Sequence, residues 1–114
     1  MNDSNQPNSP ADNDSLSLRH GHLYLEGCDV VALAAEFGTP LFVISETQLR
    51  NNLGRYKRTF ESFWPEGRVR IMPAFKASPL IAIRRVLSRE GCGCDVFGPG
   101  ELEGALHGGV IPSE

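Results

Sequence analysis

Lys76 is the residue whose type and position point most directly to covalent chemistry. It lies in the apolar run of residues 71–77, and the chain contains one other lysine, Lys57, beside nine arginines. Burial disfavours the charged form of an amine, and an amine that attacks a carbonyl carbon has to be neutral. We therefore interpret Lys76 as a Schiff-base lysine. The alternative is an ordinary lysine whose ammonium group reaches solvent from the end of a strand.

The segment that would position Lys76 is a strand predicted over residues 68–75. Side chains alternate between the two faces of a strand, so Ala74 and Lys76 share a face while Phe75 points the other way. In a barrel of parallel strands we expect the face of Lys76 to look inward, and active sites are built at the carboxyl ends of such strands. Ala74 would leave room for a flat ligand beside the amine.

The elements around this strand alternate between helix and strand. Apolar residues at helical spacing predict a helix over residues 46–63, after a capping box formed by Ser45 and Gln48. The other predicted elements are a hairpin over residues 16–26, helices over 30–37, 80–90 and 101–107, and strands over 41–44 and 92–97. Asp29 is the predicted cap of the first of these helices, and Ser78 is the predicted cap of the second.

This order of elements indicates a parallel α/β architecture, either a barrel or a doubly wound sheet. A (β/α)8 barrel takes about 250 residues, so 114 residues would hold only its first units. We expect three parts. Residues 1–15 form a disordered tail, residues 16–45 form a β-rich segment with a short helix, and residues 46–114 form the first βα units of an incomplete barrel.

Charge and composition exclude several classes of function. The formal net charge is −3 and the sequence has no block of Lys and Arg, so we expect neither a nucleic-acid partner nor a membrane partner. The amino terminus lacks the charged and apolar regions of a secretory signal. The three cysteines are an odd number, which argues against a disulfide framework. We therefore expect a cytoplasmic protein.

Other chemically suggestive residues have ordinary structural explanations. His20 and His22 flank a glycine in the predicted hairpin turn, and Cys92 and Cys94 share one face of a strand as small apolar side chains, so we predict no metal site. The arginines of the helix over residues 80–90 are predicted to form its solvated face: Arg84, Arg85 and Arg89.

Several motifs in the expected order resemble the fold-type III pyridoxal-phosphate decarboxylases, most closely the diaminopimelate decarboxylases. The run Ala-Phe-Lys-Ala at residues 74–77 is similar to the family's lysine motif. The run Gly-Cys-Gly-Cys-Asp-Val-Phe-Gly-Pro-Gly-Glu-Leu at residues 91–102 is similar to the segment that follows it after a helix. Upstream, Phe-Gly-Thr-Pro-Leu-Phe-Val at residues 37–43 and Leu-Tyr-Leu-Glu-Gly at residues 23–27 also match.

This resemblance implies an alanine-racemase-like (β/α)8 barrel with pyridoxal 5'-phosphate as cofactor. It implies that Lys76 is the catalytic residue and holds the cofactor, and that Ala74 is the small residue against it. Asp95 matches the acidic residue at the end of the next strand, and Glu101 matches a glutamate of the family's Gly-Gly-Glu-Leu segment. Without the resemblance, Asp95 is equally well explained as a carboxylate that faces water.

Three residues depart from the family pattern. Pro73 stands where the family usually has tyrosine, and it removes a hydrogen-bond donor from a strand expected to be central. Ser78 replaces the usual asparagine, and Gly98 replaces a serine. These differences bear on the substrate.

The resemblance implies the amino-terminal portion of an amino-acid decarboxylase that converts meso-diaminopimelate to lysine. Ornithine, arginine or a siderophore-type amino acid are alternative substrates. A racemase of the same fold type is less favoured, because the residues after Lys76 differ from its motif. In the family, the groups that bind the cofactor's phosphate and ring lie further along the barrel, so we expect the 114-residue chain alone to be inactive and the full-length enzyme to be a homodimer. The alternative from another class is a non-catalytic truncated paralogue.

Overall fold

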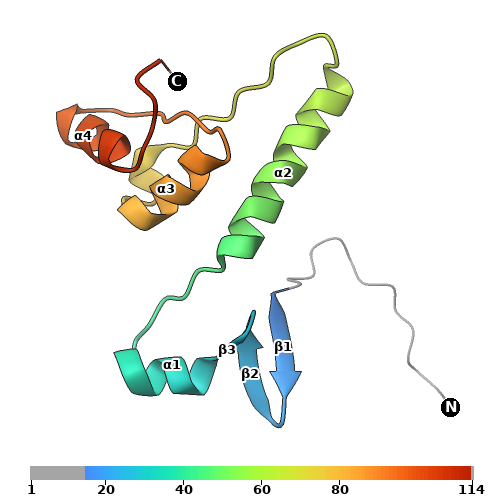
Figure 1. The fold of residues 1–114 in the computed structure, drawn as a ribbon, viewed down its shortest axis with the longest axis vertical. Helices are drawn as coiled ribbons and strands as arrows, with labels where there is room; N and C mark the ends of the chain where they lie inside the picture. The colour runs from blue at the N-terminus through green and yellow to red at the C-terminus, as the bar shows by residue number, and fades with distance from the viewer. Residues whose placement is uncertain (1–14, 114) are drawn as a thin grey trace, which may run out of the picture. The chain divides into compact units, whose positions relative to one another are not determined.

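The computed structural model describes residues 15–113, so the tail predicted for residues 1–15 lies, apart from Ser15, outside the described residues. The chain divides into two compact units, a first that ends at Gln48 and a second that begins at Leu49. The sequence-based boundary lay at residue 45. Figure 1 shows the helices and strands of each unit.

An antiparallel sheet forms the first unit, in the order β1 (Leu16–Arg19), β2 (His22–Leu25) and β3 (Cys28–Asp29). The turn between β1 and β2 consists of His20 and Gly21, whose φ angles are both positive, at 50° and 80°. Two positive φ angles are typical of the type I′ turn, whose twist matches that of a hairpin. The predicted hairpin is therefore confirmed, and β3 is a strand that the sequence analysis did not predict.

Helix α1 (Val30–Phe37) follows β3 directly and has the predicted cap. Asp29 Oδ1 accepts hydrogen bonds from the backbone N–H groups of Val31 at 2.8 Å and Ala32 at 3.4 Å. These bonds satisfy two of the donors that the first turn of a helix leaves open. Gly38 ends the helix with a φ of 83°, a region that glycine enters without a Cβ penalty.

The strand predicted over residues 41–44 is not formed. The sheet of the first unit consists of β1, β2 and β3, and within the described residues of that unit the segment 41–44 pairs with none of them. Apolar residues favour an extended conformation, but a strand also needs a neighbour for its backbone N–H and C=O groups. The prediction was therefore wrong about pairing.

Helix α2 (Glu46–Phe63) begins in the last residues of the first unit and continues into the second. Ser45 Oγ accepts a hydrogen bond from the Gln48 backbone N–H at 2.9 Å, as expected at the start of a capping box. The Glu26 carboxylate accepts hydrogen bonds from the Ser45 hydroxyl and from the Thr47 N–H, the latter at 3.1 Å. These bonds, led by that from Ser45, hold the pKa of Glu26 below its ordinary value.

The second unit contains two extended segments that run side by side in the parallel direction. We call residues 71–75 and 93–95 the paired segments. Three backbone N–H···O=C hydrogen bonds join them: Gly93 to Ile71 at 3.1 Å, Asp95 to Pro73 at 3.4 Å, and Phe75 to Asp95 at 2.9 Å. Outside the named strands, the one bridge in the described chain pairs Ala74 with Asp95.

Pro73 explains why the strands predicted over residues 68–75 and 92–97 are not continuous. In a regular parallel pair, the Gly93 carbonyl would accept a hydrogen bond from the N–H of residue 73. Proline has no N–H, so this bond is missing. The ladder is interrupted in its middle, and only the bridge at Ala74 and Asp95 remains.

Three helical elements accompany the paired segments: the 3-10 turn η1 (Phe75–Ala77), α3 (Ile81–Arg89) and α4 (Pro99–His107) (Figure 1). The predicted cap of α3 by Ser78 is wrong: Leu80 stands at the N-cap position of the helix, and Ser78 instead ends η1. Helix α4 begins at Pro99, earlier than predicted. A proline is tolerated there because the first helical N–H has no partner within the helix.

Two clusters of buried side chains form the core of the second unit. The first contains Leu53 from α2, Leu87 from α3 and Cys92. The second contains Phe75, Cys94 and Ala105, the last from α4. The unit is thus an α/β arrangement in which helices pack on the paired segments. No helix within residues 15–113 combines the length and apolar character that a membrane span requires.

Candidate active site

Lys76 lies in η1, directly after the first of the paired segments, and its side chain is exposed. Its Nζ atom lies 5.0 Å from the centroid of the Phe97 ring, a cation–π contact worth about 0.5–1 kcal/mol at an exposed position. The burial predicted for this amine is therefore not found in the described chain. The run around it is apolar because Phe75 packs into the core, with 6% of its surface exposed.

The bridge between Ala74 and Asp95 determines which residues face each other across the paired segments. Two residues further along, the same register places Lys76 opposite Phe97, which accounts for their contact. Asp95 is exposed, as Lys76 is. The structure thus brings the three predicted site residues, Ala74, Lys76 and Asp95, to the carboxyl end of the paired segments.

Phe75 packs against α4 at this end of the paired segments, on the side opposite to Ala74. A Cβ atom added to Gly104 of α4 would lie 2.4 Å from Phe75 Cζ, closer than side chains can approach. Only glycine at this position lets the helix pack so near to the ring. Because successive residues of an extended segment point to opposite sides, this packing directs Ala74 away from α4.

Glu101 has a structural role in the backbone next to the site. Its Oε2 accepts a hydrogen bond from the Phe97 N–H at 2.8 Å. In a regular parallel pair that N–H would donate to the Phe75 carbonyl, which instead accepts from Ser78 N–H at 3.1 Å. The paired segments therefore separate after Asp95, and α4 begins.

Arg84 contradicts the prediction that it lies on the solvated face of its helix. Arg85 and Arg89 are exposed, but Arg84 is 1% exposed. Its guanidinium group donates hydrogen bonds to two backbone carbonyls of the paired segments, from Nη1 to Gly93 at 3.0 Å and from Nη2 to Pro73 at 3.3 Å. The physical reason for the burial is that these carbonyls accept its N–H groups, as a buried polar group requires.

Cys92 and Cys94 are buried, as predicted. Burial raises the pKa of both thiols, and the positive charge of Arg84 opposes that rise. A buried thiol with a raised pKa is a packing residue and a poor nucleophile. Elsewhere, His22 Nδ1 contacts Asp29 Oδ2 at 2.8 Å. Residues 15–113 contain no group of three or more His, Cys, Asp or Glu side chains placed to hold a metal ion.

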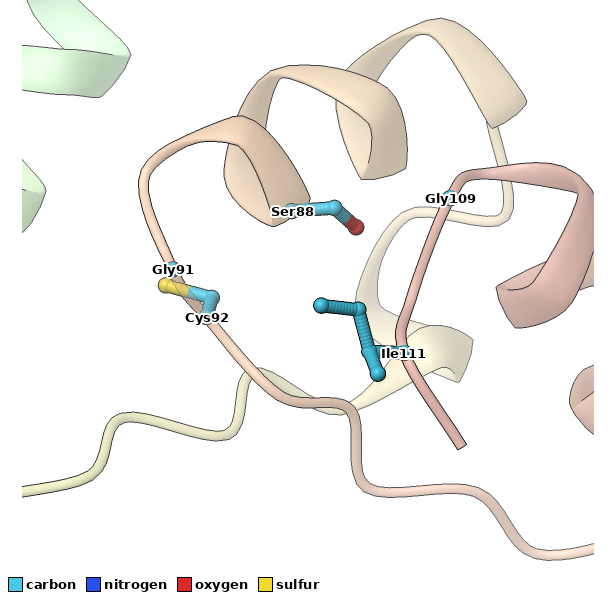
Figure 2. A pocket seen from close by; sticks show the side chains of 5 residues that line it. All are labelled: Ser88, Gly91, Cys92, Gly109 and Ile111. Atoms are coloured by element: carbon cyan, nitrogen blue, oxygen red, sulfur yellow. The ribbon is translucent and has the colours of Figure 1, made fainter. Parts of the chain in front are cut away.

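One pocket of the second unit lies away from Lys76. Figure 2 shows it between the end of α3, the chain at Cys92 and the chain after α4. Its lining consists of Ser88, Gly91, Cys92, Gly109 and Ile111. Cys92 directly precedes the second paired segment, at its amino-terminal end. Lys76 and Asp95 lie at the carboxyl end of the paired segments. The pocket is therefore not part of the candidate site.

Sequence reasoning missed two residues around the site, and each left a signal. Phe97 follows Asp95 at the same spacing as Lys76 follows Ala74, so the register of a parallel pair would have predicted their contact. Arg84 comes three residues before Leu87, and this spacing places it on the apolar face of α3.

The comparisons with known proteins find diaminopimelate decarboxylases over most of the chain. It is 41% identical to the enzyme of Methanocaldococcus jannaschii over 92 residues, which cover 79% of this chain and 21% of the relative. It is 43% identical to the enzyme of Methanothermobacter thermautotrophicus over 93 residues, which cover 81% of this chain and 21% of the relative. No family model matches the chain.

Solved structures give the same result. The crystal structure of the M. jannaschii diaminopimelate decarboxylase superposes with a TM-score of 0.79 at 38% identity, over 86% of this chain and 23% of that one. A second crystal structure of that enzyme is a complex with L-lysine. The chain spans about a fifth of the length of the curated relatives it matches. The resemblance to the amino-terminal portion of diaminopimelate decarboxylases is confirmed.

Proposed function

We propose that the protein carrying this chain is a pyridoxal-phosphate-dependent decarboxylase that converts meso-diaminopimelate to lysine. In this proposal, residues 46–114 form the first units of a (β/α)8 barrel. The observation that carries it is the position of Lys76 within a chain 41% identical to a diaminopimelate decarboxylase. The lysine follows directly on a parallel pair, at the carboxyl end, where barrel enzymes build their active sites.

The residues at this end have separate proposed roles. Lys76 would hold the cofactor through its amine, which is accessible because the side chain is exposed. Ala74 would leave space for the flat ring. Asp95, paired with Ala74 across the segments, would accept a hydrogen bond from the amine and hold a proton near it. Pyridoxal phosphate, when bound, supplies the electron sink that allows an amino acid to lose its carboxylate.

The residues present fit one part of this cofactor. An exposed amine with a small neighbour suits its aldehyde and ring, but the phosphate and the ring nitrogen need further partners. We assign those partners to other parts of the protein. Because the phosphate and the ring nitrogen would lack these partners, we expect the 114-residue chain alone to capture the cofactor weakly and to catalyse no decarboxylation.

The choice of substrate rests on the relatives, which are diaminopimelate decarboxylases. Diaminopimelate, ornithine and arginine each carry a second cationic group, so each is a candidate substrate. The test is release of carbon dioxide by the whole protein from each substrate in turn. The largest kcat/KM is expected for meso-diaminopimelate. A larger kcat/KM for ornithine or arginine would identify that amino acid as the substrate instead. We also propose a homodimer, which analytical ultracentrifugation of the whole protein tests.

Covalent trapping at Lys76 tests the proposed chemistry. Pyridoxal phosphate is added to the whole protein, the product is reduced with borohydride, and the modified peptide is identified by mass spectrometry. Lys57 is the matched control, because it is also exposed and lies in α2. Label at Lys76 in clear excess over Lys57 is expected, and the Lys76→Arg variant should lose that label. Equal labelling of the two lysines, or label elsewhere, would refute the assignment.

A non-catalytic paralogue is the second candidate. It predicts that the whole protein traps no pyridoxal phosphate and releases no carbon dioxide from any of the three substrates. Trapping together with release of carbon dioxide would separate the two cases, because the non-catalytic paralogue would show neither.

A further inference from the structure

Arg84 is the largest fully buried side chain in the described chain, with 1% of its surface exposed. No ion pair with a carboxylate is found for it among residues 15–113, and its Nε atom has no hydrogen-bond partner. A buried arginine normally has an anionic partner, because an uncompensated buried charge is strongly destabilising. Here the partners are main-chain carbonyls of Gly93 and Pro73. This choice of partners needs an explanation.

The hydrogen-bond pattern of the paired segments supplies one. Residue 93 of a regular parallel pair donates its N–H to residue 71 and accepts from the N–H of residue 73. The first of these bonds is present, at 3.1 Å. The second cannot form, because Pro73 has no N–H. The Gly93 carbonyl is therefore left without its regular donor, and Arg84 Nη1 donates to it at 3.0 Å.

The second guanidinium bond reaches the other segment. Arg84 Nη2 donates to the Pro73 carbonyl at 3.3 Å, and the same carbonyl also accepts the long 3.4 Å bond from Asp95 N–H. The guanidinium group therefore bridges both paired segments at the point where the ladder is broken. Its planar fork of donors suits two acceptors held at a set separation.

The packing around Arg84 holds its side chain in this position. A Cβ atom added to Gly108, the residue that ends α4, would lie 2.2 Å from Arg84 Cγ and 2.7 Å from its Cβ. Only glycine permits so close an approach. The end of α4 thus covers the stem of Arg84, while its guanidinium group contacts the paired segments.

We infer that Arg84 replaces the hydrogen-bond donor that Pro73 removes, and that it keeps the paired segments in register. It is a positioning residue for Lys76 and Asp95, which lie at the carboxyl end of these segments. The catalytic meaning of this positioning rests on the function proposed above. The replacement of the donor does not, because it follows from the hydrogen bonds alone.

A double-mutant cycle tests the inference in the whole protein. Arg84→Met removes both donors and keeps an unbranched apolar stem. Pro73→Val restores an N–H at residue 73 in a residue suited to extended structure. If Arg84 stands in for the missing N–H, its loss should be costly in the parent and nearly harmless in the Pro73→Val background. Arg85→Met is the matched control, since Arg85 is the neighbouring exposed arginine of the same helix.

The readout is hydrogen–deuterium exchange at the N–H groups of Phe75 and Asp95, which join the paired segments. Arg84→Met should speed this exchange by about five- to a hundredfold, the loss expected when a buried carbonyl is left unsatisfied. The Pro73→Val/Arg84→Met variant should return it to within about threefold of the parent. The Arg85→Met variant should leave it unchanged.

The outcomes separate the two proposals. The inference would be overturned if Arg84→Met accelerated amide exchange equally in the parent and in the Pro73→Val background. It would also be overturned if neither Arg84→Met nor the Pro73→Val/Arg84→Met variant folded. Rescue of exchange by Pro73→Val supports it, including the case in which Arg84→Met alone does not fold. Trapping of pyridoxal phosphate at Lys76 is measured on the same variants. If the parent traps none, the proposed function fails while rescue of exchange still supports the donor replacement. If the parent traps it, trapping should fall with Arg84→Met and recover in the double variant.

Discussion

Each of the two units of the chain is stabilised internally by a different kind of interaction. The buried apolar side chains of the described chain all belong to the second unit, from Leu53 to Ala105. Among residues 15–48 of the first unit, the side chains that fix the structure are polar and near the surface, namely Glu26, Asp29 and their partners. The difference predicts that core substitutions act on the second unit and that acid acts on the first.

The two units also differ in how closely their side chains pack. In the second unit, α4 approaches Phe75 and Arg84 so closely that only glycine fits at residues 104 and 108. In the first unit, the hairpin and α1 are defined by turn and cap geometry, which depends on particular residues in the turn and at the cap and not on close packing. The candidate site lies in the unit with the tighter packing.

The largest effect is expected from Phe75→Ala. Removing a buried phenyl ring costs about 3–5 kcal/mol of the free energy of unfolding, which is comparable to the whole stability of a small unit. Urea unfolding followed by circular dichroism measures the loss. Phe97→Ala is the control, because Phe97 is 84% exposed, and it should cost no more than about 1 kcal/mol, the upper value of its cation–π contact with Lys76. Equal effects of the two substitutions would contradict the assigned core.

A smaller effect is expected from Gly108→Ala. The added Cβ would lie 2.2 Å from Arg84 Cγ, and such overpacking typically costs about 1–3 kcal/mol. Gly100→Ala is the matched control, because nothing lies within 4 Å of a Cβ at that position of α4. Thermal unfolding of both variants gives the comparison. A control that destabilises as much as Gly108→Ala would show that helix geometry, and not contact with Arg84, sets the cost.

Acid is expected to loosen the first unit before the second. Hydrogen bonds from Ser45 to Glu26 and from His22 to Asp29 are the leading causes that lower the pKa of these carboxylates. A lowered folded-state pKa gives stability that is present above the unfolded-state value, roughly 4, and is lost as pH falls through the folded-state value. Amide exchange of β2 and α1 should therefore rise below about pH 4. The Asp29→Asn variant should show a smaller rise of amide exchange in acid. A rise confined to the second unit would contradict the prediction.

Thiol labelling should distinguish the units with the least disturbance of the structure. Cys28 is exposed, whereas Cys92 and Cys94 are buried with raised pKa values. Near pH 8, N-ethylmaleimide should react with Cys28 at least about tenfold faster than with the other two. Mass spectrometry of timed samples measures the rates. In urea the three labelling rates should converge. Convergence without urea would show that the core of the second unit is open.

The helices could be predicted from the sequence because their signals are local. Asp29, Gly38 and the Ser45–Gln48 pair lie within a few residues of the helix ends that they define. The extended segments could not be predicted as reliably, since pairing depends on residues distant in sequence. Pro73 gave the one local warning, a missing donor, but the residue that compensates for it lies eleven positions away in another element.

The candidate site could be predicted in position but not in environment. The alternation of side chains correctly placed Phe75 opposite Ala74. The resemblance implied that Asp95 lies at the end of the next strand, and the structure pairs it with Ala74. The prediction that Lys76 is buried was wrong, because an apolar run shows that one face packs against a core and not that both do. Charge alone also misplaced Arg84, because the hydrogen bonds that compensate its burial come from backbone carbonyls that no sequence pattern displays.

The dependence of Arg84 on Pro73 has a consequence for protein engineering. A chimera that takes residues 68–75 from a homologue with any residue other than proline at position 73 would introduce an N–H that competes for the Gly93 carbonyl. The guanidinium group would then share that acceptor with the new N–H, and its own hydrogen bond would weaken. Segment exchange should therefore move positions 73 and 84 together, as a single unit that spans the strand and the helix.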